Sequence, residues 1–280
     1  MTEKQPVDNT ASGVLLSNST ETPAAVRTLA LTVAYDGSGF KGFARQPGQV
    51  TVQGAIEQAL LTLFRREVLT TGAGRTDSGV HALGQVVSFN LGADEIDGRS
   101  LVKLQASLNA LTPDGLTVRA LSERPPGFSA RFSARSREYR YRVITSSTPP
   151  VFLARYAWWV PSDGPLDVNA MRRAAAFLVG EHDFKAFCVA SSAEGATTMR
   201  RIEQVFLFGV QHLGESGIVI QVVGNAFLHS MVRVIAGSLV EVGRGSREPE
   251  WVGEALASRD RRAAGPTAPA HGLTFWRVSY

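Results

Sequence analysis

The densest group of residues that could carry out chemistry is the stretch GRTDSGVHA at 74–82, where Asp77 lies between two glycines. Flanking glycines allow backbone turns that other residues resist, and such turns can expose a carboxylate to a ligand. Arg75, two residues before Asp77, supplies a nearby cation that favours the ionised carboxylate. We therefore predict that Asp77 acts as a nucleophile or as a base. The simpler alternative is a turn in which Asp77 accepts hydrogen bonds from the backbone.

A metal site is a second possibility for the same stretch, because His81 follows Asp77 by four residues. A metal-dependent hydrolase that uses Asp77 and His81 is therefore a rival function, which insensitivity to chelators would exclude. No HExxH motif, CxxC motif or second cluster of histidine and aspartate accompanies this pair. We expect neither a metal nor a cofactor.

Basic and aromatic residues alternate in a second stretch, between Phe128 and Tyr141. Positive charge for phosphates and flat rings for bases are what single-stranded or looped nucleic acid requires. Only four of the 29 basic residues are lysines, and the planar fork of arginine suits phosphate contact, although a GC-rich genome would give the same bias. The arginines in this stretch and directly after it are Arg131, Arg135, Arg137, Arg140 and Arg142.

The composition indicates a folded protein, and 280 residues allow one large domain or two smaller ones. Hydrophobic residues make up 44%, and the 27 glycines and 13 prolines are too few for a collagen-like or low-complexity chain. No stretch approaches the ~18 uninterrupted apolar residues of a membrane helix, so we expect no membrane span. The first residues do not resemble a secretory signal, and Cys188 is the only cysteine, which we expect in the core. We therefore expect a cytoplasmic protein.

The hydrophobic pattern predicts the elements that must position these residues. Residues 1–26 are polar and without periodicity, and we expect a disordered tail. In the first half, at 27–124, we predict strands at 28–35, 68–72, 85–89 and 116–121 and helices at about 51–64 and 101–111. In the second half, at 125–280, we predict strands at 138–144, 202–208, 218–223 and 274–280 and helices at 167–179 and 229–242.

Both halves thus follow the order β-α-β-β-α-β, and Pro125-Pro126 interrupts the pattern between them. We predict an α+β fold with two ferredoxin-like units and a central mixed, mainly antiparallel sheet. Duplicated units commonly leave a cleft between the halves, and ligands bind in clefts.

Five segments of the chain, in this order, resemble the tRNA pseudouridine synthase A family. They are YDGSGFKGF at 35–43, GRTDSGVHA at 74–82, FSARFSA at 128–134, REYRYRV at 137–143 and NAFLHSMVRVIAGSLVEVG at 225–243. The resemblance extends from Thr28 to Tyr280 and implies the pseudouridine-synthase fold. It also implies an isomerase that converts uridine to pseudouridine at positions 38, 39 and 40 in the anticodon stem-loop of tRNA. Such an enzyme works as a homodimer without metal or cofactor.

The resemblance makes Asp77 the catalytic aspartate and assigns five residues to substrate binding. These are Arg75, which contacts RNA near the flipped nucleotide, Tyr139, which stacks on the target uracil, Arg131, which contacts tRNA, Arg233, which pairs with the catalytic aspartate, and Leu273, which lines the pocket. The sequence leaves open whether Asp77 attacks the ribose or acts as a base there. It also leaves open whether the Tyr139 hydroxyl assists loss of the C5 proton, and a strand tyrosine in the core is the alternative for Tyr139.

Arg233 lies on a mostly apolar predicted helix, where an unpaired cation facing the core would be costly. It must therefore reach water or a buried acid, and Asp77 is the acid we propose. His229, on the same helix, is given no role. The chain departs from the family at Gly42-Phe43-Ala44, where Gly-Trp-Gln is usual, and at Ser78, where Ala is usual. The segment 191–195, expected to contact RNA, also lacks basic residues.

An RNA-binding relative without catalysis is the other rival function, because the stretch of arginines and aromatic residues would serve it equally well. Retention of both Asp77 and Tyr139 argues against that rival.

Overall fold

The computed structural model describes residues 1, 25–161, 164–189, 195 and 197–280. The expected tail at 1–26 falls mostly outside these residues, as do 191–194 of the segment expected to contact RNA. No described helix is both long enough and apolar enough to cross a membrane.

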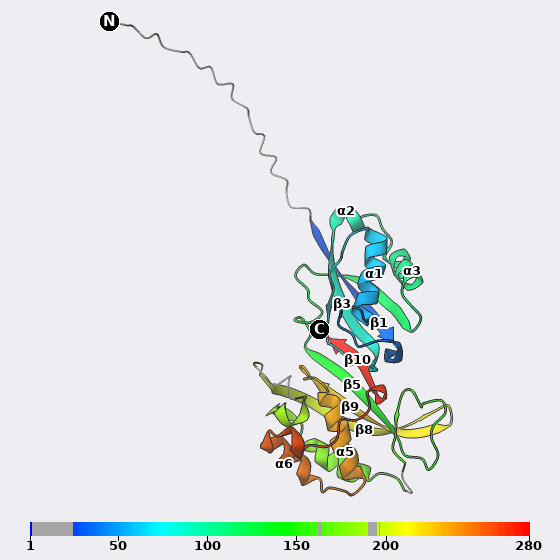
Figure 1. Cartoon of the computed structure of the whole chain (residues 1–280), viewed down its shortest axis with the longest axis vertical. Helices are drawn as coiled ribbons and strands as arrows, with labels where there is room; N and C mark the ends of the chain where they lie inside the picture. The colour runs from blue at the N-terminus through cyan, green and yellow to red at the C-terminus, as the bar shows by residue number, and fades with distance from the viewer. Residues whose placement is uncertain (2–24, 162–163, 190–194, 196) are drawn as a thin grey trace.

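A single ten-stranded sheet runs through both halves, in the order β4-β1-β3-β10-β5-β9-β8-β7, with β2 paired to β3 and β6 paired to β5 (Figure 1). The strands of the first half are β1 (Val26–Tyr35), β2 (Thr71–Gly72), β3 (His81–Gly92) and β4 (Leu116–Arg124). Those of the second half are β5 (Ser136–Ile144), β6 (Trp158–Trp159), β7 (Gly180–Asp183), β8 (Met199–His212), β9 (Glu215–Gly224) and β10 (Leu273–Ser279).

Helices α1 (Val52–Phe64) and α3 (Leu101–Leu111) lie beside the sheet of the first half, with the short α2 (Ala93–Ile96) nearby (Figure 1). Thr51 caps α1 by accepting a hydrogen bond from the Gly54 amide at 3.2 Å. Leu29, Leu31 and Val33 on one face of β1 are almost fully buried, and Thr28 and Ala30 on its other face are buried as well.

The second half contains α4 (Val168–Ala176), α5 (Met231–Gly243) and α6 (Glu250–Ser258). Eleven of the thirteen residues of α5 are buried, and they belong to a hydrophobic core that extends through both halves. A Cβ at Gly237 would lie 1.9 Å from the Pro266 carbonyl oxygen, so only glycine allows the 261–270 segment to pack on α5. Short 3-10 helices are η1 (Gly37–Gly39), η2 (Phe184–Phe187), η4 (Arg261–Ala263) and η5 (Ala270–Gly272).

Strand β10 joins the two halves, because it is parallel to β3 on one side and antiparallel to β5 on the other. Just after it, the Tyr280 hydroxyl donates to the Ala130 carbonyl at 2.9 Å. The remaining long strand pairs are antiparallel. The predicted α+β fold with a mixed, mainly antiparallel central sheet is confirmed.

Several predicted boundaries are wrong, for physical reasons. Strand β3 begins at His81 instead of 85 because both of its faces are largely buried, so alternation does not mark its start. The strand predicted at 68–72 shrinks to Thr71–Gly72. Helix α5 begins at Met231 instead of 229, since Ser230 has a left-handed backbone. The pattern also missed the short elements α6, β6 and β7. Cys188 is fully buried, as expected.

Candidate active site

A cavity of about 1060 Å³ lies between the two halves, at the predicted cleft. The first half contributes the segments around 41–53 and 70–80, and the second contributes the segment 226–232 together with residues of β5 and β10. Five of the six residues predicted to form the site line this cavity, and the sixth, Arg233, forms an ion pair with Asp77. Those in the lining are Arg75, Asp77, Arg131, Tyr139 and Leu273.

The loop that carries Asp77 is held from beneath by a buried polar network. The Gln85 side-chain amide donates to the Gly74 carbonyl at 2.6 Å, and the Tyr35 and Thr76 hydroxyls lie 2.8 Å apart. Burial raises the pKa of Tyr35 to about 12, so its hydroxyl keeps its proton and stays a hydrogen-bond partner. The Phe43 amide donates to the Thr76 carbonyl at 3.0 Å. These bonds fix the loop on both sides of Arg75.

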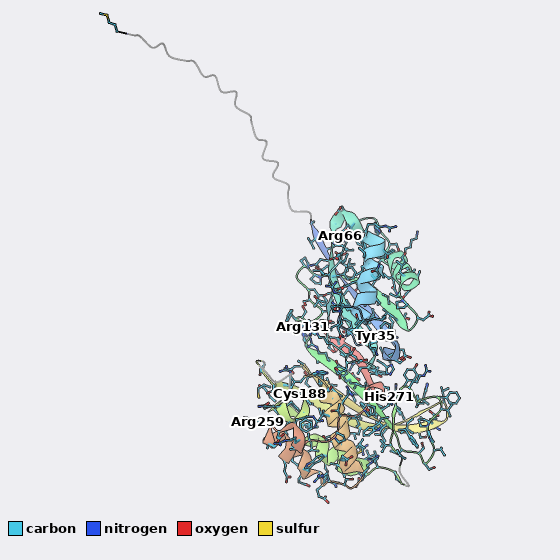
Figure 2. The ribbon with its side chains drawn as sticks, viewed as in Figure 1. Tyr35, Arg66, Arg131, Cys188, Arg259 and His271 are labelled. Carbon is cyan, nitrogen blue, oxygen red and sulfur yellow. The ribbon has the colours of Figure 1, made fainter. Side chains whose placement is uncertain are left out.

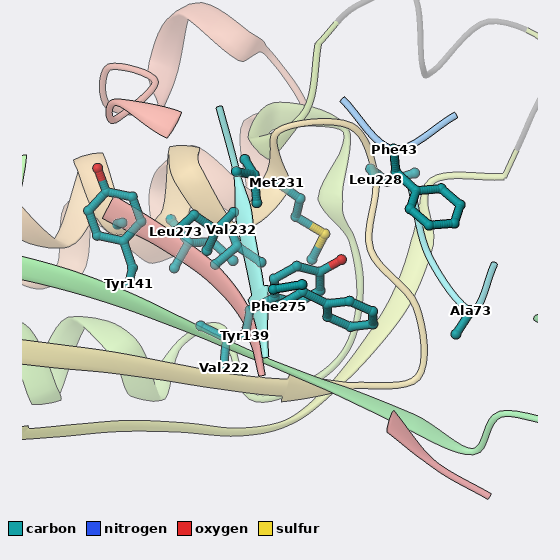
Figure 3. Packing of buried hydrophobic residues seen from close by; sticks show 14 of the residues in the cluster. Phe43, Ala73, Tyr139, Tyr141, Val222, Leu228, Met231, Val232, Leu273 and Phe275 are labelled. Atoms are coloured by element: carbon teal, nitrogen blue, oxygen red, sulfur yellow. The ribbon is translucent and has the colours of Figure 1, made fainter. Parts of the chain in front are cut away.

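The departure at Gly42-Phe43-Ala44 affects packing behind this loop. Phe43 is buried, and a Cβ at Gly72 would lie 2.3 Å from its ring. Gly42 has φ +92° and passes close to the Thr76 carbonyl, a backbone conformation that favours glycine. Figure 3 shows the Phe43 ring beside Ala73, at the base of the loop. Phe43 thus fills a core position that supports the loop.

The charged partners of Asp77 come from the start of α5. Arg233 Nη1 donates to Asp77 Oδ2 at 2.8 Å, and Ser230 Oγ donates to the same oxygen at 2.9 Å. His229 Nε2 lies 3.3 Å from the other oxygen, Oδ1. The Asp77 side chain is 21% exposed, so a ligand in the cavity can reach it. The carboxylate is therefore held by two donors and remains open to a ligand.

Ser230 adopts a backbone conformation that suits this contact. It occupies the N-cap position of α5 with φ 59° and ψ 8°, which is uncommon for a residue with a Cβ. Its hydroxyl makes no capping bond and instead donates to Asp77. Arg233 is fixed as well, since its Nε donates to the Ala268 carbonyl at 2.8 Å. The positive end of the α5 dipole also lies at this point and favours an anion.

Arg75 does not supply the cation beside Asp77, contrary to the sequence-based expectation. Its side chain is exposed and forms no ion pair or hydrogen bond with any residue that the structure describes. Arg233, which α5 brings against this loop, is the cation that pairs with Asp77 instead. Arg75 still lines the cavity, where its guanidinium is free to contact RNA.

Tyr139 and Leu273 form the apolar floor of the cavity. Tyr139 is 7% exposed, and its ring stacks on Phe275 with the centroids 4.6 Å apart, while Phe227 contacts it edge-on at 5.0 Å. Figure 3 shows the Tyr139 and Phe275 rings together, with Met231 close by. Burial raises the pKa of the Tyr139 hydroxyl well above its usual value. Within the described ranges this hydroxyl has no hydrogen-bond partner, so it is free to bond a substrate.

Replacement of Tyr139 separates the hydroxyl from the ring. Tyr139→Phe is expected to keep tRNA affinity and to lower kcat/KM about 2- to 10-fold, the effect of one hydrogen bond. Tyr139→Leu is expected to weaken binding of the flipped uracil by a further ~1–3 kcal/mol, because it removes the ring on which the base stacks. Tritium release from tRNA labelled at uridine C5, compared with tRNA affinity, measures both effects. Wild-type values for both variants would leave Tyr139 as a core tyrosine only.

The five arginines at positions 131–142 do not form one continuous RNA-binding surface. Arg131 and Arg135 are exposed, and Figure 2 places Arg131 where the two halves meet. Arg140 pairs with the buried Glu138 at 2.8 Å and lies 3.8 Å from the Trp276 ring centroid. Alternation along β5 directs Arg140 and Arg142 away from the face that carries Tyr139. Only the beginning of the stretch is therefore placed to contact RNA in the cavity.

Arg137 is buried and connects three segments of the cavity wall. Its guanidinium donates to the Ala73 carbonyl at 3.1 and 3.2 Å, to the Arg131 carbonyl at 2.6 Å and to the Asn225 carbonyl at 2.5 Å. A further bond reaches the Ala134 carbonyl at 3.3 Å. Burial lowers its pKa, and carbonyl dipoles take the place of a carboxylate partner. Arg137 holds the wall together instead of contacting phosphate.

His81 does not form a metal pair with Asp77. Its Nδ1 accepts a hydrogen bond from the Gly37 amide at 3.0 Å, and its Nε2 lies 3.0 Å from the Arg155 carbonyl. Burial lowers the pKa of the imidazole, which matches a neutral ring with Nε2 protonated. In the described part of the chain, no three His, Cys, Asp or Glu side chains gather as metal ligands. His81 instead links a turn of the first half to the segment before β6.

Sequence reasoning missed three residues of the site, namely His229, Ser230 and Arg137. His229 lies before α5 begins at Met231, so helical spacing to Arg233 could not place it beside Asp77. The left-handed conformation of Ser230 and the burial of Arg137 could not be read from residue types.

The comparisons with known proteins agree with this geometry. A family model described as tRNA pseudouridine synthase matches residues 31–133 and 174–280. Fold and site therefore define an isomerase that rearranges uridine to pseudouridine in RNA. The chain is 42% identical to tRNA pseudouridine synthase A of Thermotoga neapolitana and 43% identical to that of Brevibacillus brevis, in each case over 91% of this chain and 100% of the relative. The chain belongs to the tRNA pseudouridine synthase family.

Proposed function

We propose that this enzyme converts uridines 38, 39 and 40 of the tRNA anticodon stem-loop to pseudouridine, as a cytoplasmic homodimer, with Asp77 as its essential carboxylate. The observation that carries the proposal is the position of Asp77, which lies in a cleft between the halves, fixed by Arg233 and Ser230 and still accessible. The relatives of similar length named tRNA pseudouridine synthase A support the same activity.

The reaction explains why the cavity contains these residue types. The N1–C1′ bond of uridine breaks, the uracil turns, C5 joins C1′, and the C5 proton leaves. Asp77 assists at the ribose, as a nucleophile on C1′ or as a base. The target nucleotide must leave its stack at a cost of a few kcal/mol, and contacts in the cavity must offset that cost.

The residues around Asp77 divide this work. Arg75 and Arg131, both exposed at the cavity, hold the backbone on either side of the flipped nucleotide. The Tyr139 hydroxyl and ring contact the uracil, and Leu273 closes the apolar side of the pocket. Arg233 does not touch the substrate in this scheme and holds the Asp77 carboxylate in place through the 2.8 Å ion pair.

An unmodified tRNA transcript tests the proposal. Purified enzyme is expected to form pseudouridine at positions 38 to 40 of transcripts that carry uridine there, and mapping at single-nucleotide resolution locates the product. A transcript with cytidine at these positions is the matched control and should gain none. Pseudouridine formed only outside the anticodon stem-loop would contradict the proposed positions while leaving the family intact.

Arg131 should contribute a measurable share of the salt dependence of binding. Each phosphate neutralised by a basic side chain releases counterions and adds roughly 0.7–0.9 to the slope of log affinity against log salt. Arg131→Ala is therefore expected to lower that slope by about one such increment. Arg173→Ala, on the exposed side of α4 and outside the cavity lining, is the control and should leave the slope unchanged. Equal slopes for wild type and Arg131→Ala would place the RNA elsewhere.

The homodimer has a direct test as well. The proposal rests on the family and on a stem-loop substrate that is large for one cleft. Light scattering at micromolar concentration is expected to give about twice the 30.1 kDa mass of the chain. A mass near 30.1 kDa together with full activity would contradict it.

A further inference from the structure

The two oxygens of Asp77 differ in their surroundings. Oδ2 accepts hydrogen bonds from Ser230 and Arg233, and the second of these donors is itself fixed by the Ala268 carbonyl. Among the described residues, no donor is hydrogen-bonded to Oδ1, and His229 Nε2 lies 3.3 Å from it. Oδ1 is therefore the oxygen that is free to act on the ribose.

The reaction brings C5 of the uracil to this same oxygen. Whether Asp77 attacks C1′ or acts as a base at the ribose, Oδ1 lies next to the sugar at C1′. Once C5 has joined C1′, it occupies the place that N1 held, so the C5–H bond also lies beside Oδ1. A proton acceptor within about 3 Å of Oδ1 is therefore within reach of that hydrogen.

Few groups in the cavity can accept this proton. Besides Asp77, the titratable side chains in the described lining are four arginines, Lys41, Tyr139 and His229. Arginine and lysine are cations and have no free lone pair. Tyr139 is buried and retains its own proton, so it serves as a hydrogen-bond partner. The Ser230 hydroxyl already donates to Oδ2. Apart from Asp77, His229 is the base that remains, since an imidazole nitrogen can accept a proton, and its side chain is 52% exposed.

We propose that His229 is a catalytic residue that accepts the C5 proton in the last step of the isomerisation, an inference that rests on the proposed role of Asp77. The C5–H bond breaks, and its electron pair becomes the C5–C6 double bond. The pair of the N1–C6 double bond moves onto N1, which takes a proton from water. The C5 proton passes to Nε2 of the neutral imidazole, which returns it to water through its exposed side. Protons and electrons balance, and no co-reactant is required.

Three variants and one small molecule test the assignment. Under single-turnover conditions with tRNA tritiated at uridine C5, His229→Ala and His229→Gln are both expected to release tritium at least tenfold more slowly than wild type, since a general base contributes typically 10²–10⁴-fold. The tRNA affinity of both should stay within about twofold. Added imidazole should restore His229→Ala, because a half-exposed side chain leaves a space open to the cavity. His212→Ala, at the exposed end of β8, is the control and should match wild type.

The glutamine variant separates proton transfer from positioning. The side chain introduced by His229→Gln is not basic, but it keeps a polar group of similar reach beside Oδ1. Wild-type release by His229→Gln would show that His229 only orients Asp77, and failure of imidazole to restore His229→Ala would also overturn the proposal. If wild type forms pseudouridine at normal rates and the His229 variants do too, only this inference fails. If wild type forms none in tRNA, the proposed function itself fails.

Discussion

Asp77→Asn is expected to abolish pseudouridine formation, with a loss of at least about 1000-fold, equivalent to ~4 kcal/mol of transition-state stabilisation. An asparagine amide has the shape of the carboxylate and can accept the bonds from Ser230 and Arg233, but it lacks the charge needed for attack or proton abstraction. Binding of tRNA should change little, because positioning contacts come mainly from exposed arginines. The measurements are pseudouridine yield and tRNA affinity for the same preparation.

Folding should survive this change. Arg233 keeps its bond to the Ala268 carbonyl, the asparagine oxygen can still accept its other bond, and the cavity admits water, so the variant should remain folded. Ser78→Ala is the matched control in the same loop, since it removes only a long contact of 3.3 Å to the Phe40 carbonyl. It should retain activity within about twofold. More than a trace of activity in Asp77→Asn would remove Asp77 from its role as the essential carboxylate.

The largest loss of stability is expected from Arg137→Met. Methionine fills a similar volume but leaves the carbonyls of Ala73, Arg131 and Asn225 without their donor in a buried site. Each buried unsatisfied group costs about 1–3 kcal/mol, so the free energy of unfolding should fall by at least about 3 kcal/mol. Urea unfolding measures it. Activity should fall too, even where the variant remains folded, because the three carbonyls belong to three segments of the cavity wall.

Two further variants sharpen this result. Arg135→Met replaces a nearby exposed arginine whose side chain has no bonded partner in the described chain, and it should change stability by less than about 0.5 kcal/mol. Arg137→Lys keeps the charge but cannot reach carbonyls on several sides, so it should recover only part of the loss. Similar unfolding free energies for Arg137→Met and Arg135→Met would mean that the buried bonds contribute nothing net.

The local hydrophobic pattern and the sequence motifs predict several elements of the fold and part of the active site. The alternation of β1, the cap at Thr51 and the apolar stripe of α1 are each determined by neighbouring residues, so they can be read directly. The partner of Arg233 was also within reach, because a cation on an apolar helix requires an acid nearby. Asp77 was recognised from its loop and its family.

The rest depends on long-range packing. Residue types show that Arg137 and Arg140 are charged, but not that one is enclosed by carbonyls while the other pairs with Glu138 on the opposite face of β5. The sequence distance between His229 and Asp77 gives no indication of their contact, which depends on where α5 begins. Tertiary context of this kind is absent from any window of a few residues.

The central place of β10 has a consequence for synthesis on the ribosome. β10 follows every other strand along the chain, yet it lies between β3 and β5. About 180 residues separate the end of β3 from Leu273, so roughly 10 to 40 s pass at ~5–20 residues/s before β3 meets this partner. Until β10 arrives, the edges of β3 and β5 that it will cover are unpaired, and such edges can pair wrongly with other chains. The cavity around Asp77 is complete only after β10 has been synthesised. A nascent chain on a ribosome that stalls before this point contains Asp77 but lacks Leu273.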